Sequence, residues 1–118
     1  LIVTTGLNYI ASRMKDATAT AMTHMGLGSG TTAAAAGDTD LESILGSREA
    51  LDSTTATNNT ITYVASFEAG DATGAVTEMG LFNASTGGTM LARVVFAVVK
   101  KQSDDTMTVT HTISIQAS

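Results

Sequence analysis

Apolar and polar residues alternate through the second half of the chain, which is the pattern of half-buried β-strands. Two stretches show it most clearly, with Thr or Ser at most of the intervening positions: Ile61, Tyr63, Ala65 and Phe67 in 60–67, and Met107, Val109, His111, Ile113 and Ile115 in 107–115. Between them, the stretches 74–84 and 89–101 flank Gly87 and Gly88, which supply the positive φ angles of a tight hairpin. Four such segments joined by short turns predict an antiparallel sheet or β-sandwich.

One segment of this half is apolar on both faces. Residues 94–99 read Val-Val-Phe-Ala-Val-Val, without a polar position. Two apolar faces are typical of a strand at the buried centre of a sheet. We therefore expect 94–99 to be the central strand, covered on one side by a sheet partner and on the other by a helix or by another subunit.

The helical patterns lie in the first half of the chain. Apolar residues at helical spacing predict an N-terminal helix in 5–15: Leu7, Ile10, Ala11 and Met14. The same spacing over one turn predicts a further short helix that ends at Gly46: Leu41, Ile44 and Leu45. Residues 19–27 alternate weakly and favour a strand, and 28–40 is expected to be an exposed loop. The sequence thus predicts one mainly β domain over 1–118, an antiparallel sandwich or sheet with an N-terminal helix and one further short helix.

A single carboxylate, Glu78, stands inside an apolar strand segment, Val-Thr-Glu-Met-Gly-Leu-Phe. Strict alternation places it on the same face as Val76 and Phe82. A buried carboxylate without a partner costs several kcal/mol, so Glu78 needs a cation or several N–H donors. The internal arginines Arg48 and Arg93 can both provide one. We expect Arg48, at the end of the Leu-rich segment, to form a bidentate ion pair with Glu78 that joins the two halves of the chain.

The composition narrows the classes of function. The 118 residues carry a net charge of −5, and only 14% of them are charged, so neighbours can pack against this surface with few charges to desolvate. The six cations are scattered and the aromatic residues number only five, so direct binding of nucleic acid is not expected. The absence of Cys excludes disulfides and thiolate chemistry. No apolar run approaches the length of a membrane span, about 18 residues, and no membrane partner is expected.

The candidate reactive residues form no recognisable catalytic arrangement. The stretch Gly-Leu-Gly-Ser-Gly-Thr at 26–31 lacks the Lys of a phosphate loop, and turns with positive φ are the ordinary reason for such glycines. His24 and His111 each stand alone in an alternating stretch, without a second His at ligand spacing. No nucleophile-elbow pattern is present. We therefore expect no catalytic residues, no metal and no cofactor, and the chain is not expected to be an enzyme.

The order of motifs along the chain resembles a module of tailed-bacteriophage virion proteins, in particular the N-terminal region of tail-collar and tail-fibre proteins. The series that carries the resemblance is a glycine-rich Gly-x-Gly-x-Thr turn, a Leu-rich segment ending at Arg48, the strand Glu78-Met79-Gly80-Leu81-Phe82, the return strand Leu91-Ala92-Arg93, and Lys100 before a closing alternating strand. The resemblance implies a non-enzymatic role in an oligomer attached to other virion proteins. It implies no catalytic residues.

Three functions stay open from the sequence. Fibres continue past this module into long shafts, whereas this sequence ends at Ser118, so the first expectation is a capsid decoration (cement) protein. It would act as a homo-oligomer, expected to be a trimer, at joints between major capsid subunits. The acidic net charge of the chain is compatible with a place on the outer capsid surface. The first alternative is a tail or tail-fibre attachment component. The second is a small glycan- or peptide-binding module using a surface around Asn58, Asn59 and Asn83.

Two segments are expected to contact the partner proteins. The first is the N-terminal segment, Leu1, Ile2 and Val3, and the second is the start of the glycine-rich loop, Gly28, Ser29, Gly30, Thr31 and Thr32. A long exposed loop and an uncovered sheet edge both suit the addition of a partner. The sequence does not begin with Met, which leaves open whether residues before Leu1 are missing.

Overall fold

The structure is a computed structural model that describes residues 1–15 and 20–116. One helix, α1 (Thr4–Lys15), precedes seven strands in those residues. The strands are β1 (His24–Gly28), β2 (Glu49–Ala50), β3 (Ser53–Thr57), β4 (Thr60–Phe67), β5 (Gly74–Phe82), β6 (Met90–Lys101) and β7 (Met107–Ser114). The predicted N-terminal helix is confirmed, and the strand predicted from residue 19 begins at His24; residue 19 itself lies outside the described residues.

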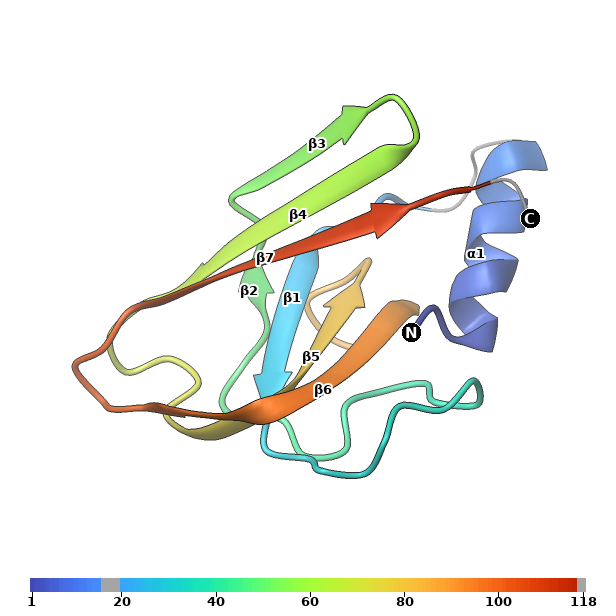
Figure 1. Ribbon diagram of the computed structural model, residues 1–118. Helices are drawn as coiled ribbons and strands as arrows, with labels where there is room; N and C mark the ends of the chain where they lie inside the picture. The colour runs from blue at the N-terminus through green and yellow to red at the C-terminus, as the bar shows by residue number, and fades with distance from the viewer. Residues whose placement is uncertain (16–19, 117–118) are drawn as a thin grey trace.

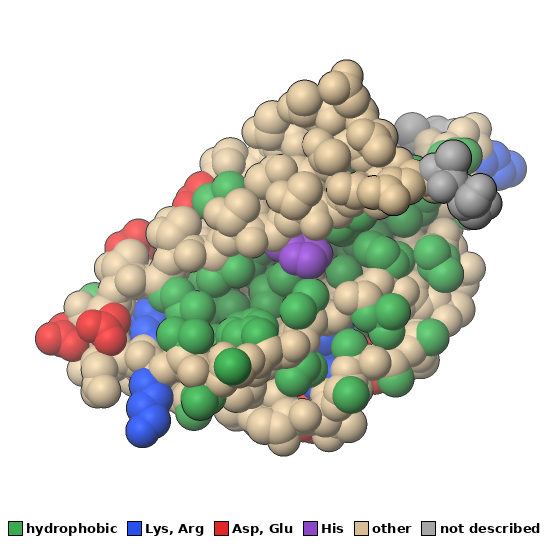
Figure 2. All heavy atoms as spheres, viewed as in Figure 1, with side chains coloured by type: hydrophobic (Ala, Val, Ile, Leu, Met, Phe, Trp, Pro, Cys, Tyr) green, Lys and Arg blue, Asp and Glu red, His purple; other side chains and the backbone are tan. Residues whose placement is uncertain are grey.

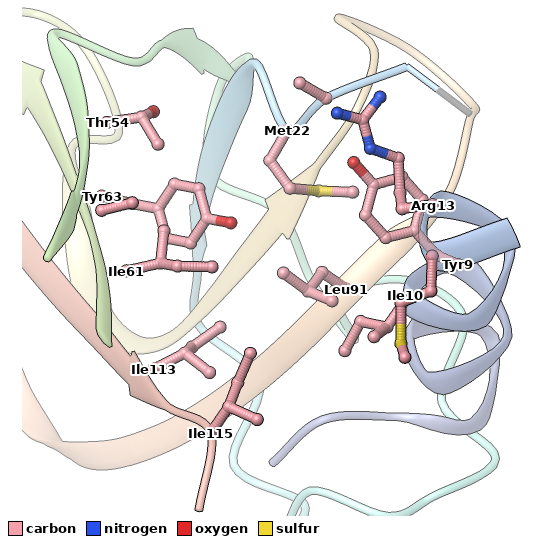
Figure 3. A pocket seen from close by; sticks show the side chains of 13 residues that line it. Tyr9, Ile10, Arg13, Met22, Thr54, Ile61, Tyr63, Leu91, Ile113 and Ile115 are labelled. Atoms are coloured by element: carbon pink, nitrogen blue, oxygen red, sulfur yellow. The ribbon is translucent and has the colours of Figure 1, made fainter. Parts of the chain in front are cut away.

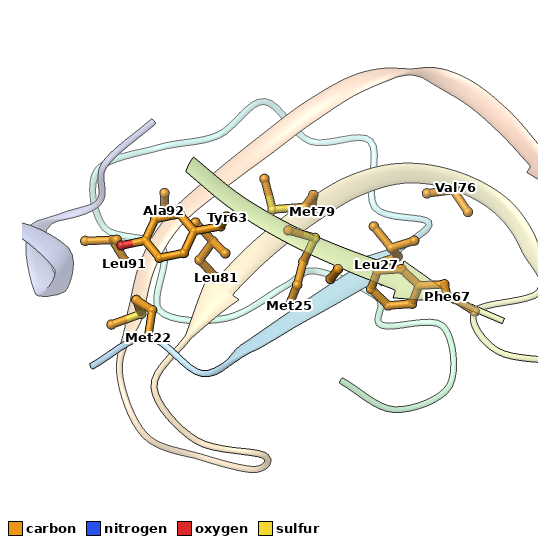
Figure 4. Close-up of a cluster of buried hydrophobic side chains, with 12 residues drawn as sticks. Met22, Met25, Leu27, Tyr63, Phe67, Val76, Met79, Leu81, Leu91 and Ala92 are labelled. Atoms are coloured by element: carbon orange, nitrogen blue, oxygen red, sulfur yellow. The ribbon is translucent and has the colours of Figure 1, made fainter. Parts of the chain in front are cut away.

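The strands form two antiparallel sheets that face one another, as predicted for a mainly β fold (Figure 1). The first sheet has the order β2-β1-β5-β6, and the second has the order β3-β4-β7. Side chains from both sheets meet in one core, in which Met25, Met79 and Leu81 of the first sheet lie against Tyr63 and Phe67 of the second (Figure 4). The hydrophobic effect along this shared face holds the sheets together.

Alternation correctly predicted β4 and β7 of the second sheet, whereas β3, which is exposed at every position, was not predicted. In β4, Tyr63, Ala65 and Phe67 are buried and the residues between them are half-buried, while β7 alternates half-buried and exposed positions along its whole length. The hairpin between β5 and β6 contains Gly87 and Gly88 at φ values of 62° and 67°, as the turn required.

The strand predicted to be central is an edge strand. β6 stands at the end of its sheet, and Val98 and Val99 are 55% and 44% exposed. The segment contains a bulge, in which three residues of β6, 96–98, stand opposite Thr77 alone, and pairing with β5 then resumes from Val99 to Lys101. The valines near this end stay accessible because no strand lies beyond β6 in its sheet among the described residues. The central positions belong to β1 and β5, whose glycines allow another layer of chain to lie directly on the sheet.

The further short helix predicted to end at Gly46 is absent, because residues 38–46 have no helical turn. Their backbone N–H groups are used elsewhere: Glu42 and Ser43 donate theirs to the carboxylate of Glu78, and Leu45 donates to the carbonyl of Leu27 in β1. A tertiary hydrogen bond at these positions replaces the local one that a helix would make. The loop 29–48 therefore forms a third layer on the outer face of the first sheet.

The N-terminal residues are also part of the first sheet. Ile2 forms an antiparallel bridge with Ala92, and Leu1 and Arg93 exchange both backbone hydrogen bonds at 3.0 Å. α1 then crosses β6 with Gly6 pressed against the carbonyl of Leu91, where a side chain would collide. A second small core joins this segment to the loop layer and the hairpin: Val3, Leu41, Phe82 and Met90.

Candidate functional site

The carboxylate of Glu78 is completely buried between the first sheet and the loop layer, and it accepts four hydrogen bonds. Its Oε2 accepts from the backbone N–H groups of Gly30 and Ser43, both at 2.8 Å. Its Oε1 accepts from the N–H of Glu42 and from Nε of Arg93, both at 2.9 Å. These four donors match the roughly four lone-pair sites that a carboxylate offers. Glu78 therefore acts as an internal anchor for the loop.

The glycines of 26–31 make room for this carboxylate. A Cβ atom on Gly28 would lie 2.5 Å from Glu78 Oε2 and from the carbonyl oxygen of Ser43, and a Cβ on Gly30 would also collide with Glu78. Gly30 is held from both sides, because its carbonyl accepts a hydrogen bond from the Thr77 hydroxyl at 2.7 Å. The prediction of positive-φ turns at these glycines was wrong, since neither has such a φ angle. They are needed for close approach.

The predicted ion pair between Arg48 and Glu78 is wrong, because the cation that binds Glu78 is Arg93. Arg93 is 2% exposed, and its Nη1 also donates to Asp38 Oδ2 at 3.0 Å, which brings a second loop carboxylate to the sheet. Arg93 Nη2 is buried without a hydrogen-bond partner among the described residues. The guanidinium thus joins β5, β6 and the loop in one network.

Arg48 serves a different part of the fold. Its guanidinium lies over the ring of Phe82, 3.5 Å from the centroid, which is a cation–π arrangement. Nη1 donates to the carbonyls of Ala84 and Gly87 at 2.9 and 2.8 Å, and Nη2 lies 3.7 Å from Asp40. Arg48 is therefore too engaged with the β5–β6 hairpin to bind Glu78, and it fixes the hairpin against the loop layer.

The electrostatics of the network favour charged carboxylates. Burial raises the pKa of Glu78, but the N–H groups of Glu42 and Ser43, the Arg93 guanidinium and the N–H of Gly30 outweigh it, so the pKa lies below its ordinary value. The backbone N–H of Ala35, with further help from Arg93, lowers the pKa of Asp38. A general acid or base working near neutral pH needs the opposite shift. The pKa of Glu78 therefore supports a structural role.

The expected partner-contact residues divide into two groups. Val3, Gly28 and Gly30 are buried within the chain itself, which removes them as direct contacts in this conformation, whereas Leu1, Thr31 and Thr32 are exposed and Ile2 and Ser29 are half-buried. The backbone N–H groups of Thr31 and Thr32 donate to Glu42 at 3.0 and 3.3 Å, so this exposed part of the loop has a defined shape. Contact with a partner there stays a prediction.

Neither histidine belongs to a recognisable reaction centre. His24 Nδ1 lies 2.8 Å from the hydroxyl of Thr23, and His111 is half-buried on β7 opposite Tyr63, where burial lowers its pKa. Within residues 1–15 and 20–116, no three His, Asp or Glu side chains are grouped so that they could hold a metal ion. In the same residues, no helix is both long and apolar enough to cross a membrane.

The feature that sequence reasoning missed is the open side of the sandwich, where β6 and β7, the end strands of the two sheets, leave apolar residues accessible. Figure 2 shows a hollowed band of apolar side chains there, below a ridge of mostly polar surface. We call this the apolar face and define it by its half-buried or exposed residues on the two strands: Val94, Phe96, Val98, Val99, Val109 and Ile113, with Ile115 beyond β7. The sequence did indicate this face, because residues 94–99 are apolar on both sides of the strand. We interpreted that pattern as a central strand.

Comparison with known proteins adds no family. No family model matches the chain, and no curated protein matches its sequence. The resemblance to the phage tail-collar and tail-fibre module therefore depends on the order of motifs alone.

Proposed function

We propose that this chain is a non-enzymatic structural protein of a bacteriophage virion: a capsid decoration protein that forms a homotrimer and binds at joints between major capsid subunits. The order of motifs from the Gly-x-Gly-x-Thr turn to Lys100 supports the phage origin. Glu78 and Arg93 support a structural role, because both charged groups are buried and paired with one another where they hold the loop to the sheet.

The observation that carries the proposal is the apolar face. Single exposed apolar residues are ordinary, but contiguous apolar patches beyond a few hundred Å² mark sites of association. Here the face follows the open side of the sandwich (Figure 2). Three of the residues that define it are exposed large apolar side chains: Val98, Val99 and Ile115. A protein that works by covering such a surface with neighbours fits a shell or an oligomer.

The weakly charged surface suits binding in many copies. Each contact of low charge density requires little desolvation, and many weak contacts together stabilise a shell by mass action. The net charge of −5 disfavours a place against packaged DNA and is compatible with the outer surface of the capsid.

Copy number tests this proposal directly. Particles are purified from a phage whose genome encodes this chain, and the chain is quantified by gel densitometry against the major capsid protein. The expected result is hundreds of copies per particle. A few to a few dozen copies would overturn the decoration role in favour of a tail or tail-fibre attachment component. Absence from the particles, together with binding of an isolated glycan or peptide by the purified chain, would overturn the virion role altogether.

A stability assay separates decoration from incidental attachment. Particles lacking the chain should release their DNA at a lower temperature than complete particles, and addition of the purified chain should restore the original temperature. Bovine serum albumin at the same concentration is the control for non-specific protection. If release occurs at the same temperature with and without the chain, the cement function is excluded.

A further inference from the structure

A pocket of about 510 Å³ lies where the sandwich opens toward α1 (Figure 3). Its walls come from α1, from strands of both sheets and from the segment before β1, and most of the lining is aliphatic: Ile10, Met22, Ile61, Leu91, Ile113 and Ile115. The volume is within the range of sites for small molecules, about 300–1,000 Å³. The pocket is therefore large enough for a small apolar molecule.

Tyr63 places a polar group in this apolar wall. The residue is only 6% exposed, and within residues 1–15 and 20–116 its hydroxyl makes no hydrogen bond. Figure 3 shows the hydroxyl pointing from β4 into the pocket, toward the side occupied by α1. A buried tyrosine hydroxyl usually has a hydrogen-bond partner. A molecule that fills the pocket can supply this partner if it carries a polar atom at that point.

The polar groups of the pocket favour an uncharged molecule. Tyr9 lies on the α1 side of the pocket, and burial raises the pKa values of Tyr9 and Tyr63, so both hydroxyls are neutral near neutral pH. Arg13 also lines the pocket, but it has another interaction of its own. A charged group would therefore lose its hydration here without a free counter-charge, which is costly.

We propose that this pocket binds a small, uncharged, mainly apolar molecule that carries one hydrogen-bonding oxygen, such as an aliphatic alcohol. The oxygen would bind the Tyr63 hydroxyl, and the alkyl part would lie between the isoleucines of the second sheet and α1. Such a molecule would contact both α1 and the second sheet, so it should stabilise the folded chain. This inference does not depend on the virion role.

The chain carries its own reporter for this site. It has two Tyr and no Trp, and both Tyr line the pocket, so its intrinsic fluorescence comes from there. Addition of n-octanol should change the tyrosine emission with saturation, with a Kd below about 1 mM. The midpoint of thermal unfolding should rise by at least about 2 °C at saturation. Absence of a saturable change in emission would overturn the proposal.

The variant Tyr63→Phe removes the hydroxyl and keeps the ring, and Tyr9 still reports on binding. Loss of one hydrogen bond should raise the Kd for n-octanol about threefold to tenfold. An unchanged Kd would show that the Tyr63 hydroxyl does not bind the ligand oxygen. Octanoate, which has the same chain length but a negative charge, should bind at least about tenfold more weakly than n-octanol near neutral pH. Equal or tighter binding of octanoate would overturn the uncharged class.

Two neighbouring positions of β3 locate the binding site. Ala56 and Thr55 are both exposed, but Ala56 lines the pocket and Thr55 points to the opposite face of the strand. Ala56→Phe should fill part of the pocket and weaken n-octanol binding at least about tenfold, whereas the matched control Thr55→Phe should bind like the unaltered chain. Equal Kd values for the two variants would place the alcohol elsewhere on the molecule and refute this site.

Discussion

Glu78 Oε1 accepts a hydrogen bond from Arg93 Nε at 2.9 Å, diagonally across the β5–β6 hairpin. Glu78 stands opposite Val95, and Arg93 stands opposite Gly80, so the two charged side chains are diagonal neighbours on one face. The same carboxylate accepts three N–H groups from the loop layer. A single buried charge pair therefore ties the hairpin to a loop that has no regular structure of its own.

Replacement of Glu78 by Gln should strongly destabilise the fold. Each carboxylate oxygen accepts two hydrogen bonds, so an amide NH₂ in either position would meet two donors and leave them unsatisfied, while Arg93 would lose its counter-charge. Breaking a buried pair in this way costs about 3–5 kcal/mol. Urea denaturation of both proteins measures the difference in the free energy of unfolding.

Glu68→Gln is the control for loss of one carboxylate, because Glu68 is exposed and should change that free energy by no more than about 0.5 kcal/mol. If Glu78→Gln behaves like this control, Glu78 is not the anchor described above.

Double-mutant cycles should separate the two arginines. Glu78 and Arg93 share a buried hydrogen bond, so Glu78→Met and Arg93→Met should show a coupling energy of about 2–3 kcal/mol. Arg48 binds Phe82 and the hairpin carbonyls, so Glu78→Met and Arg48→Met should be additive within about 0.5 kcal/mol. The coupling energies come from the free energies of unfolding of the single and double variants. A larger coupling to Arg48 would contradict the assignment.

The partner of Glu78 could not have been fixed by counting along the hairpin. Phe82 pairs with Met90 next to the turn, and regular counting from that pair would place Gly80 opposite Ala92. The register shifts between Leu81 and Phe82, which brings Gly80 opposite Arg93 and places Arg93 on the same face as Glu78. Choosing between Arg48 and Arg93 therefore required an irregularity of the ladder that no local pattern marks.

Other features could not have been predicted from local patterns. The bulge of β6 inserts residues that no turn signal marks, and it transfers Val76 to the main core beside Met79 although alternation placed Val76 with Glu78. The absent short helix has the same kind of cause, since tertiary hydrogen bonds to Glu78 take the N–H groups that a helix would use. Local periodicity correctly predicted β4 and β7 because one face of each is more buried than the other along its length. It did not predict β2 and β3, which have no buried face.

Glycine substitutions should reveal the space that the carboxylate needs. Gly28→Ala and Gly30→Ala would each place a methyl group against Glu78, and such overpacking costs about 1–3 kcal/mol. Gly37→Ala is a matched control in the same loop, because a Cβ there meets nothing within 4 Å and should change stability by less than about 0.5 kcal/mol. Thermal unfolding midpoints rank the three variants. Equal effects at Gly28 and Gly37 would show that the loop does not press on Glu78.

The stability of the fold should fall in acid in a way that depends on Glu78. Its pKa in the folded chain lies below the ordinary value of 4.5, so the folded state binds fewer protons than the unfolded state as this carboxyl titrates. The stabilisation from Glu78 is then fully present above that ordinary value and is lost as the pH falls through the folded pKa. Asp38 and Glu42 have lowered pKa values as well and act in the same direction.

Urea denaturation at a series of pH values, from about pH 7 to about pH 3, measures this effect. The free-energy difference between the unaltered chain and Glu78→Gln should be constant near neutrality and should shrink below about pH 4.5, because the unaltered chain loses a charged anchor that the variant never had. Part of the acid sensitivity should persist in the variant through Asp38 and Glu42. A difference that stays constant over the whole range would mean that Glu78 keeps its ordinary pKa in the folded chain.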